Sequence, residues 1–227
     1  MLFKPFDEQA TVRIYYTSMP HWRQAGCTYF VTYRLADSIP EGVLREWEFE
    51  KLKWIQPRVV GSVVNRTTAT KWQEHFPKLS ESDKRDFLKY FNRKLNTYLD
   101  NSHGSCVLRR PAFAKIIEVS WTFFDGQRYE LGDLVVMPNH VHVLLTPYAN
   151  FELEDILRNR KRQSASDCNK LLKESGTFWQ KHSFDHIVRD VKELKAFQGY
   201  IANNPVKAKL RVGEFLHRRH EWELSEC

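Results

Sequence analysis

The pattern of hydrophobic and polar positions first becomes regular at residues 27–35. In this stretch, CTYFVTYRL, aromatic and β-branched residues are frequent, and the odd-numbered and even-numbered positions form two distinct faces. An alternation of period two predicts a β-strand. The stretch 131–145, LGDLVVMPNHVHVLL, predicts a second strand, or a pair of strands interrupted at Pro138. A proline inside a strand indicates an edge strand or a bulge.

Helical spacing of apolar residues predicts helices in much of the remaining chain. The block 43–110 is mostly helical and charged in character, and a candidate N-cap serine opens SESDKRDFLKYFNRKLNTYLD at 80–100. The stretch 111–124 begins with a proline, which is favoured at the first helical position. Further helices are predicted at 151–174 and 191–201, and NNPVKAKLRV at 203–212 is expected to begin another element.

The order of these elements predicts the fold class. One strand, a long insert, a helix, one or two strands and further helices are typical of an α+β domain with helices packed on one face of an antiparallel sheet. We interpret residues 1–227 as a single domain, with 37–108 as a mostly helical insert and 205–227 as a C-terminal tail element.

Composition supports an ordinary globular protein. Hydrophobic residues make up 42% of the 227 residues, and no apolar run approaches the ~20 residues needed to span a bilayer. The N-terminal MLFKPFDEQA lacks the apolar core of a signal peptide, so we expect a cytoplasmic protein. The cysteines are widely spaced and form no C-x-x-C pair, which argues against a zinc knuckle or a disulfide framework. They are Cys27, Cys106, Cys168 and Cys227.

Charge adds a candidate partner. The net charge of +7, from 35 basic and 28 acidic residues, fits a polyanionic partner such as nucleic acid. Aromatic residues make up 14% of the chain, and exposed rings can stack on unpaired bases, although core packing explains most of them equally well. The helix predicted at 151–174 carries a dense basic patch.

His140 and His142 are the first candidates for chemistry. On a strand, residues two apart point to the same face and lie about 6–7 Å apart at the backbone, so the two imidazoles can converge on one divalent ion. A third ligand from elsewhere in the chain would be needed, with positions left open for water or substrate. The alternative is a pair of polar side chains on a wetted strand face, and the three-residue pattern alone does not decide between the two.

Tyr200 and Asn204 are the second candidates. On a helix that starts at Val191, they lie one turn apart on one face, beside an apolar stripe. Tyr200 can equally be a packed ring with its hydroxyl in water. Asn204 precedes Pro205, a signature of an N-cap followed by proline at the first position of a new helix, so the first helix can end there and the spacing hold only approximately.

Several stretches together resemble the single-tyrosine transposases of the IS200/IS605 type and their relatives, the REP-associated tyrosine transposases. VVMPNHVHVLL (135–145) resembles their HUH motif of histidine, hydrophobic residue and histidine. GTFWQKHSFDHIVRDVKELKAFQGYIANNPVKAKL (176–210) resembles their tyrosine region. PHWRQAGCTYFVTYRL (20–35) and FFDGQRYEL (123–131) are also similar to that family. The stretches occur in the family's order and cover most of the chain outside the insert, and they imply the family's ferredoxin-like HUH fold.

The resemblance implies a metal-dependent enzyme that nicks and rejoins single-stranded DNA at hairpins. His140 and His142 would bind Mg²⁺ or Mn²⁺, and Tyr200 would attack the scissile phosphate to give a 5′-phosphotyrosine link and a free 3′-hydroxyl. Asn204 stands where the insertion-sequence relatives carry a glutamine as third metal ligand. The sequence has no G-x-x-x-x-G-K-[ST] loop, which agrees with a covalent intermediate that conserves the phosphodiester energy without ATP.

The family recognises imperfect palindromes folded as hairpins, which implies a DNA-binding surface. Basic side chains would contact phosphates, and Trp179 or His182 could stack on an unpaired base. The candidate contacts are Arg109, Arg110, Arg158, Arg160, Lys161, Arg162, Trp179, Lys181, His182, Arg189, Lys207 and Lys209.

Two other interpretations stay open from the sequence. One is a non-catalytic protein that binds DNA hairpins, and the other is a hydrolytic metal nuclease without a covalent step. The presence of both histidines and of Tyr200 favours an active transposase. The oligomeric state, monomer or homodimer, and the action of Tyr200 in cis or in trans are undetermined. By this resemblance we expect a bacterial cytoplasmic protein that associates with the nucleoid when bound to DNA.

Overall fold

The structure, a computed structural model, describes residues 3–16, 20–59 and 71–223. The chain divides into two compact units, one formed by Met1–Ser38 with Ser105–Cys227 and the other by Ile39–Gly104. Cys27, Cys106 and Cys168 are free thiols, and Cys227 lies outside the described residues.

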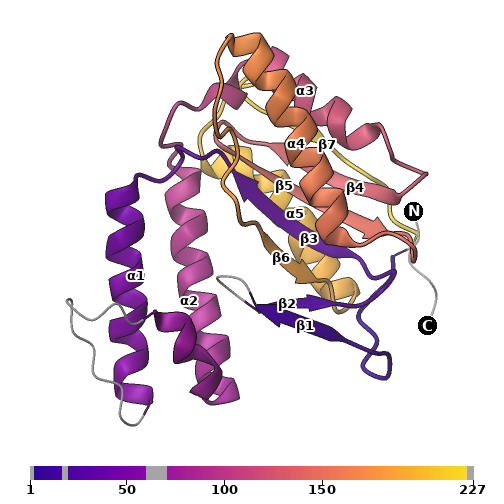
Figure 1. The fold of residues 1–227 in the computed structure, drawn as a ribbon. Coiled ribbons are helices and arrows are strands. Elements are labelled where there is room, and N and C mark those ends of the chain that lie inside the picture. Colours follow the sequence, from indigo (N-terminus) through magenta and orange to yellow (C-terminus); the bar gives the residue numbers. More distant parts are fainter. Residues whose placement is uncertain (1–2, 17–19, 60–70, 224–227) are drawn as a thin grey trace. The chain divides into compact units, whose positions relative to one another are not determined.

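The first unit is built on a five-stranded antiparallel sheet with the strand order β6-β3-β5-β4-β7 (Figure 1). Its strands are β3 (Tyr29–Arg34), β4 (Tyr129–Val136), β5 (His140–Pro147), β6 (Phe184–Ile187) and β7 (Leu216–Arg218). A separate two-stranded sheet pairs β1 (Arg13–Tyr16) with β2 (Pro20–Arg23). The predicted α+β class with an antiparallel sheet is confirmed.

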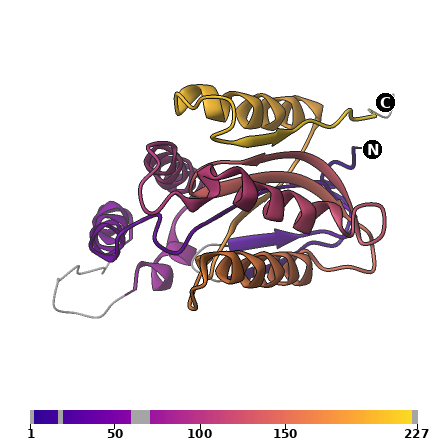
Figure 2. The same cartoon turned by 90° about the horizontal axis from the view of Figure 1, so that it is seen from above.

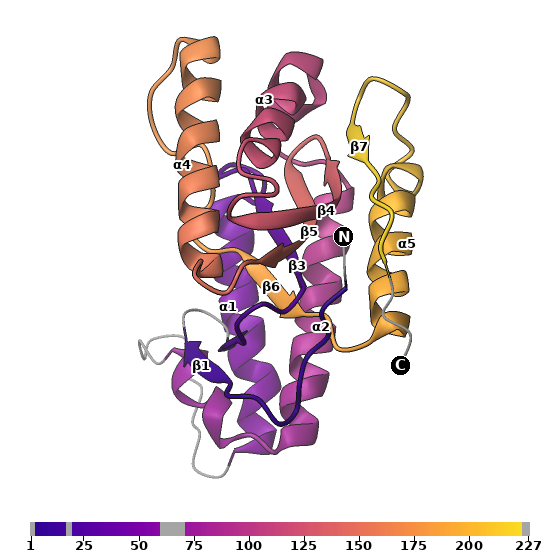
Figure 3. The ribbon, with the colours of Figure 1, turned by 90° about the vertical axis from the view of Figure 1, so that its right-hand side faces the viewer.

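Helices cover both faces of this sheet, so the prediction of helices on one face is wrong. α3 (Pro111–Thr122) and α4 (Leu153–Leu172) share one apolar cluster with one face of the sheet. α5 (Val191–Lys207) shares a second cluster with the opposite face, and Figures 2 and 3 show α4 and α5 on opposite sides of the strands. The physical reason is that the strands also carry apolar residues on the α5 face, among them Phe30, Val135 and Leu144, and these must be covered as well.

Pro138 lies in the turn between β4 and β5, at neither an edge nor a bulge. Of the two alternatives predicted for 131–145, the pair of strands is therefore the one observed. The irregularity in this hairpin lies instead in β4, where the register shifts between Leu131 and Leu134. β5 is the central strand and is buried along its whole length.

The helix that carries Tyr200 is longer than predicted. α5 runs from Val191 to Lys207 with Pro205 inside it, so no new element begins at Asn204. Asp190 caps its N-terminus by accepting a hydrogen bond from the backbone N–H of Glu193. Pro205 has no N–H to donate to the carbonyl of Ile201, yet the helix continues for two more residues. Tyr200 and Asn204 are therefore one full turn apart on a continuous helix.

The second unit contains the helical block predicted from the sequence. Its helices are α1 (Glu41–Ile55) and α2 (Glu81–Asp100), and the predicted Ser80 N-cap accepts a hydrogen bond from the backbone N–H of Asp83. Buried aromatic rings form its core, with the centroids of Trp72 and Phe87 5.1 Å apart. Short 3-10 turns of the chain lie at Gln56–Arg58, Trp72–Glu74, Phe76–Lys78 and Val107–Arg109. No helix in the described part of the chain is long and apolar enough to cross a membrane.

The irregular segment of β4 receives the C-terminal segment of the chain. A Cβ added to Gly132 would lie 2.2 Å from the ring of Trp222, so the ring occupies the space that a side chain would fill. The Nε1–H of Trp222 donates to Asp133 Oδ2 at 2.7 Å, and Gln198 on α5 donates to the same oxygen at 3.2 Å. The C-terminal segment and the tyrosine helix are thus joined through one buried carboxylate.

The ring of Trp222 fills a notch above Gly132, and this packing yields a stability prediction. We expect Gly132→Ala to lower the free energy of unfolding by about 1–3 kcal/mol, because the methyl group displaces a packed tryptophan. Gly199→Ala is the matched control, since nothing lies within 4 Å of its added Cβ and helical alanine is favoured over glycine by about 1 kcal/mol. Urea unfolding of both variants measures the difference. Equal stability of Gly132→Ala and the wild type would show that Trp222 does not occupy the notch.

Candidate active site

The two predicted metal ligands lie side by side on the central strand. His140 and His142 are both buried on the α5 face of β5, and their Nε2 atoms are 3.0 Å apart. Val141 and Val143 point to the other face and join the cluster beneath α3 and α4. The period-two arrangement expected from the sequence is therefore present, and the two imidazoles are buried, so they are not polar side chains on a wetted strand face.

Each histidine is held through its other ring nitrogen. His140 Nδ1 lies 2.7 Å from Asn139 Oδ1, so the tautomer that carries the proton on Nδ1 can donate to this oxygen. His142 Nδ1 lies 2.7 Å from the hydroxyl of Thr32 on β3, which can accept in the same way. With both Nδ1 atoms protonated, the two Nε2 lone pairs face each other. This is the arrangement in which hydrogen-bonded histidines bind a cation.

Burial keeps both imidazoles neutral. It lowers the pKa of His140 to about 3, and it holds the pKa of His142 well below the ordinary value, with the charge of His140 as a further cause. Neutral imidazole is the form that binds metal.

Asn204 places a third candidate metal ligand beside the two histidines. Its side-chain Nδ2 is 3.3 Å from His142 Nε2, and its buried Oδ1 has no hydrogen-bond partner among the residues that the structure describes. Exchanging the two amide atoms by a flip presents the oxygen to the histidine pair, and the two orientations differ only by that flip. The continuation of α5 through Pro205 keeps this amide out of an N-cap.

This donor set fits a small divalent cation. Ligands about 2.1 Å from an octahedral ion at right angles are about 3.0 Å apart, which equals the Nε2–Nε2 separation. Amide oxygens suit Mg²⁺ and Mn²⁺, and imidazole suits the transition metals. Within the described residues no group of three or more His, Cys, Asp or Glu side chains could hold a metal, so a site here depends on the amide.

Tyr200 lies beside the histidine pair. Its ring centroid is 5.0 Å from that of His142, edge to face, and 5.9 Å from that of Phe30. The ring is half-buried, and the ammonium of Lys207 lies 5.3 Å above it. Phe197 stacks on Phe30 at 4.3 Å and fixes this part of α5 on the sheet. The helix therefore holds the tyrosine, the amide and one cation against the histidines.

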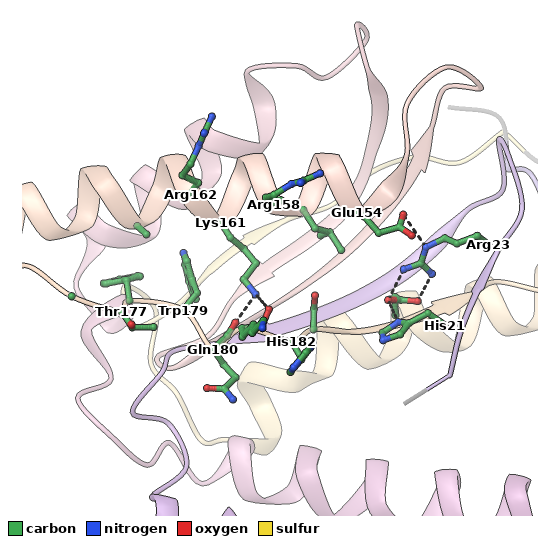
Figure 4. A pocket seen from close by; sticks show the side chains of 17 residues that line it. His21, Arg23, Glu154, Arg158, Lys161, Arg162, Thr177, Trp179, Gln180 and His182 are labelled. Atoms are coloured by element: carbon green, nitrogen blue, oxygen red, sulfur yellow. Dashed lines mark hydrogen bonds and ion pairs between the residues drawn. The ribbon is translucent and has the colours of Figure 1, made fainter. Parts of the chain in front are cut away.

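A second candidate site lies on the other side of the sheet. A pocket of about 510 Å³ is bounded by β2, α4, β6 and the loop 176–183 (Figure 4). Half of the predicted DNA contacts line it, although they come from two separate stretches of sequence. These are Arg158, Lys161, Arg162, Trp179, Lys181 and His182.

Two of the predicted contacts are engaged in packing. Arg160 is buried, donates to the carbonyl of Ser120 at 2.7 Å and lies over the ring of Phe124, which ties α4 to α3. Trp179 is buried as well, and its Nε1–H donates to Ser164 Oγ at 3.0 Å. Neither presents a free ring or guanidinium at the surface.

Lys161 reaches across the pocket to the loop. Its ammonium donates to the carbonyls of Gln180 and Lys181 at 2.5 and 2.9 Å, as Figure 4 shows. Burial lowers the pKa of Lys161 to about 8, and the positive charge of Arg34 lowers it further in the same direction.

The remaining predicted contacts are dispersed around the first unit. Arg109 pairs with Glu214 at 3.6 Å, and Arg110 lies over Phe113. Arg189 precedes α5 and Lys209 follows it, where the backbone adopts a positive φ of 54°. The fold does not gather these cations into one patch with the pocket residues.

One buried network at the pocket was missed from the sequence. The carboxylate of Asp185 on β6 accepts from Arg23 at 2.5 and 2.9 Å and from His21 Nδ1 at 2.6 Å, and Arg23 also pairs with Glu154 at 3.2 Å. Burial alone would raise the pKa of Asp185, but these hydrogen bonds outweigh it and hold the pKa below its usual value. No local pattern could reveal it, because the partners are separated by more than 160 positions.

Comparisons with known proteins agree with this site. Residues 106–204 match the family described as Transposase IS200 like. The resemblance to these transposases is therefore confirmed for this stretch of the chain. A protein of Haemophilus influenzae (strain ATCC 51907 / DSM 11121 / KW20 / Rd), described as "Putative REP-associated tyrosine transposase", is 29% identical over 90 residues. The similarity covers 35% of this chain and 51% of that relative. The chain thus spans about half the length of this relative.

One solved structure is similar over a larger part of the chain. It is described as a REP-associated tyrosine transposase bound to a REP hairpin, with 16% identity and a TM-score of 0.45. The similarity covers 85% of this chain and 74% of that one. His140, His142, Tyr200 and Asn204 all lie inside the family match, whereas the pocket residues of β2 precede it.

The buried network predicts that loss of the Asp185 carboxylate strongly lowers the stability of the fold. Asp185→Asn should lower the free energy of unfolding by about 3–5 kcal/mol at neutral pH, because it leaves the guanidinium of Arg23 buried with a weaker partner. Asp155→Asn, at an exposed ion pair with Arg158, should cost at most about 1 kcal/mol. Because the folded pKa of Asp185 is lowered, its contribution is present above the ordinary pKa of 3.8 and is lost as the pH falls below it. Urea unfolding at pH 7 and pH 3 measures both effects, and a pH-independent difference would contradict them.

Proposed function

We propose that the protein is a metal-dependent enzyme that nicks single-stranded DNA at hairpins and transfers the strand through a covalent 5′-phosphotyrosine intermediate. The observation that carries this proposal is the position of Tyr200, edge to face with His142 and one helical turn before Asn204. The match of residues 106–204 to IS200-like transposases supports it. We further propose that its substrate is a REP-like palindrome, as the name of the Haemophilus influenzae relative suggests.

The residues that would hold Mg²⁺ or Mn²⁺ are His140, His142 and Asn204. A bound divalent ion supplies charge that polarises the phosphate and stabilises the transition state. The protein prepares the site beforehand, because Asn139 and Thr32 orient the two imidazoles with their Nε2 lone pairs inward.

Tyr200 supplies the nucleophile. As the phenol oxygen bonds to phosphorus, the bond from phosphorus to the 3′ oxygen breaks, and the released 3′ oxygen takes up a proton. A phenol with an ordinary pKa of ~10 needs help from a base or a metal ion to lose its proton. The new ester keeps the energy of the broken bond, so a 3′-hydroxyl can later displace the tyrosine and restore the strand.

The DNA surface is proposed to include the pocket beside α4. Arg158, Arg162 and Lys181 on its rim would contact phosphates of the unpaired strand, and such contacts make binding fall with salt. His182 is exposed and would be the stacking side chain, in preference to the buried Trp179. Lys207 would contact the strand at the tyrosine itself.

A covalent adduct is the direct test of the proposed chemistry. The protein is incubated with Mn²⁺ and a hairpin oligonucleotide labelled in its 3′ portion, and a denaturation-resistant adduct is sought on a gel. The wild type should form the adduct, whereas Tyr200→Phe or a chelator should abolish it. His140→Ala should also abolish it, with hairpin binding retained.

The same experiment separates the other two interpretations. Cleavage that survives in Tyr200→Phe would replace the proposal with a hydrolytic metal nuclease. Hairpin binding without any cleavage by the wild type would indicate a non-catalytic binding protein. Size determination of the active species, followed by mixing Tyr200→Phe with His140→Ala, tests whether the tyrosine acts in cis or in trans.

We expect Thr32 to affect the affinity for metal without contacting the ion itself. Thr32→Val removes the hydroxyl that orients His142 but keeps the shape of the side chain, so we expect Mn²⁺ to bind about 10- to 100-fold more weakly. Thr146→Val is the matched control, because Thr146 lies on the same face of β5 and bonds to Thr28, away from the histidines. Calorimetric titration with Mn²⁺ gives the affinities. Equal losses in both variants would mean that sheet packing, and no specific hydrogen bond, sets the affinity.

A further inference from the structure

Arg34 is a cation beside the histidine pair that neither the family resemblance nor the pocket explains. In the β3–β5 pairing it stands directly opposite His140. It is two residues from Thr32, which bonds to His142, so its side chain leaves the sheet on the histidine face. Cross-strand neighbours of this kind have Cβ atoms about 4.5–5.5 Å apart.

The charge of Arg34 is buried without a counter-charge. The residue is 9% exposed, and no carboxylate in the described part of the chain lies within ion-pair distance of it. Its guanidinium donates to Ser38 Oγ at 2.9 Å, which uses one of five N–H donors. Burial lowers the pKa of Arg34 to about 10, which leaves the side chain charged at neutral pH.

A buried charge without a counter-charge destabilises the folded state. A buried ion is normally paired, because a single hydroxyl does not offset the loss of its hydration. Arg23, in the same unit, shows the usual solution, with Asp185 and Glu154 both against it. The charged group coupled to Arg34 is a second cation, Lys161, whose pKa the charge of Arg34 lowers. The region therefore lacks an anion.

We propose that Arg34 binds a phosphate of the unpaired DNA strand within one nucleotide of the scissile phosphodiester. The inference rests on the proposed function, since it assigns a residue of the same site to its substrate. A guanidinium binds phosphate in a planar, two-pronged geometry, and the bond is strongest where water is excluded. Arg34 then extends the reaction site from His140 on β5 to β3, the neighbouring strand of the sheet.

Stability in the absence of DNA distinguishes this role from a structural one. Arg34→Met keeps the length of the side chain and removes the buried charge, so the melting temperature should stay the same or rise. Inorganic phosphate at millimolar concentration should raise the melting temperature of the wild type and have little effect on Arg34→Met. A marked fall in the melting temperature of Arg34→Met, or an equal response of both proteins to phosphate, would overturn the proposal.

The decisive measurement locates the phosphate. Single methylphosphonates, which are neutral, are placed at successive positions of the hairpin strand, and affinity is measured in the Tyr200→Phe background to prevent cleavage. With Arg34 present, one position next to the cleavage site should weaken binding roughly 10- to 100-fold. With Arg34→Met, the unmodified strand should bind weakly by the same factor, and that methylphosphonate should cause no further loss. Arg34→Lys should lie between the two.

Failure of this inference differs from failure of the proposed function. Adduct formation by the otherwise wild-type protein on the unmodified hairpin is measured in parallel. If the adduct forms but the effects of Arg34→Met and of every methylphosphonate are additive, Arg34 does not contact a phosphate there. If no adduct forms, the proposed chemistry itself is wrong. Arg128→Ala, at a cation stacked on Phe124 away from the histidine face, controls for a general loss of charge.

Discussion

The antiparallel pairing of β3 with β5 is the constraint on which the rest of the first unit depends. Because strand side chains alternate with a period of two, the pairing places every second residue of both strands on each face. The face towards α3 and α4 is apolar and forms the larger core. The other face carries His140, His142, Thr32 and Arg34 together. A slip of one residue would exchange the two sets, so the stability of the core also fixes the position of the chemistry.

The tyrosine helix completes the site because it is anchored on the same face. Phe197 and Ile201 pack onto the sheet, and this packing turns Tyr200 and Asn204 towards the histidines. Gln198 adds a polar tie, since it shares the carboxylate of Asp133 with the C-terminal Trp222. Apolar packing therefore sets the rotation of α5, and the hydrogen bonds set its position along the sheet.

The sequence was most informative where one local period controls the structure. The alternation at 27–35 and the spacing of His140 and His142 follow from strand geometry alone, and both are observed. Local rules were less reliable where tertiary contacts decide. Pro205 favours a helix break by local preference, yet packing of Ile201 and the contact of Asn204 with His142 keep the helix intact. Helices on the second face could not be anticipated, because apolar residues on both faces of a strand do not identify what covers them.

The environments of the charged groups were the hardest features to predict from the sequence. The environments of Arg34 and of Asp185 are set by burial and by partners that are remote in the sequence. Neither burial nor a remote partner can be recognised from a basic residue in a predicted strand. Likewise, four neighbouring basic residues of α4 look alike in the sequence, but the helical period sends Arg160 to the α3 interface and Lys161 to the pocket. Only the packed structure separates a cation used for folding from one available to DNA.

The distribution of acids explains why these two kinds of cation have different environments. Where an arginine holds strands together, as Arg23 does, two carboxylates neutralise it. On the histidine face, the acids Asp133 and Glu193 are already occupied by donors from α5 and its flanking segments, and the candidate metal ligands are neutral imidazoles and an amide. Under the proposed function, a neutral ligand set would leave the full charge of a divalent ion, and of Arg34, to act on an entering phosphate. A carboxylate among these ligands would strengthen metal binding and weaken that attraction, so the modest ligand set is consistent with a site whose task is to hold and polarise a phosphodiester.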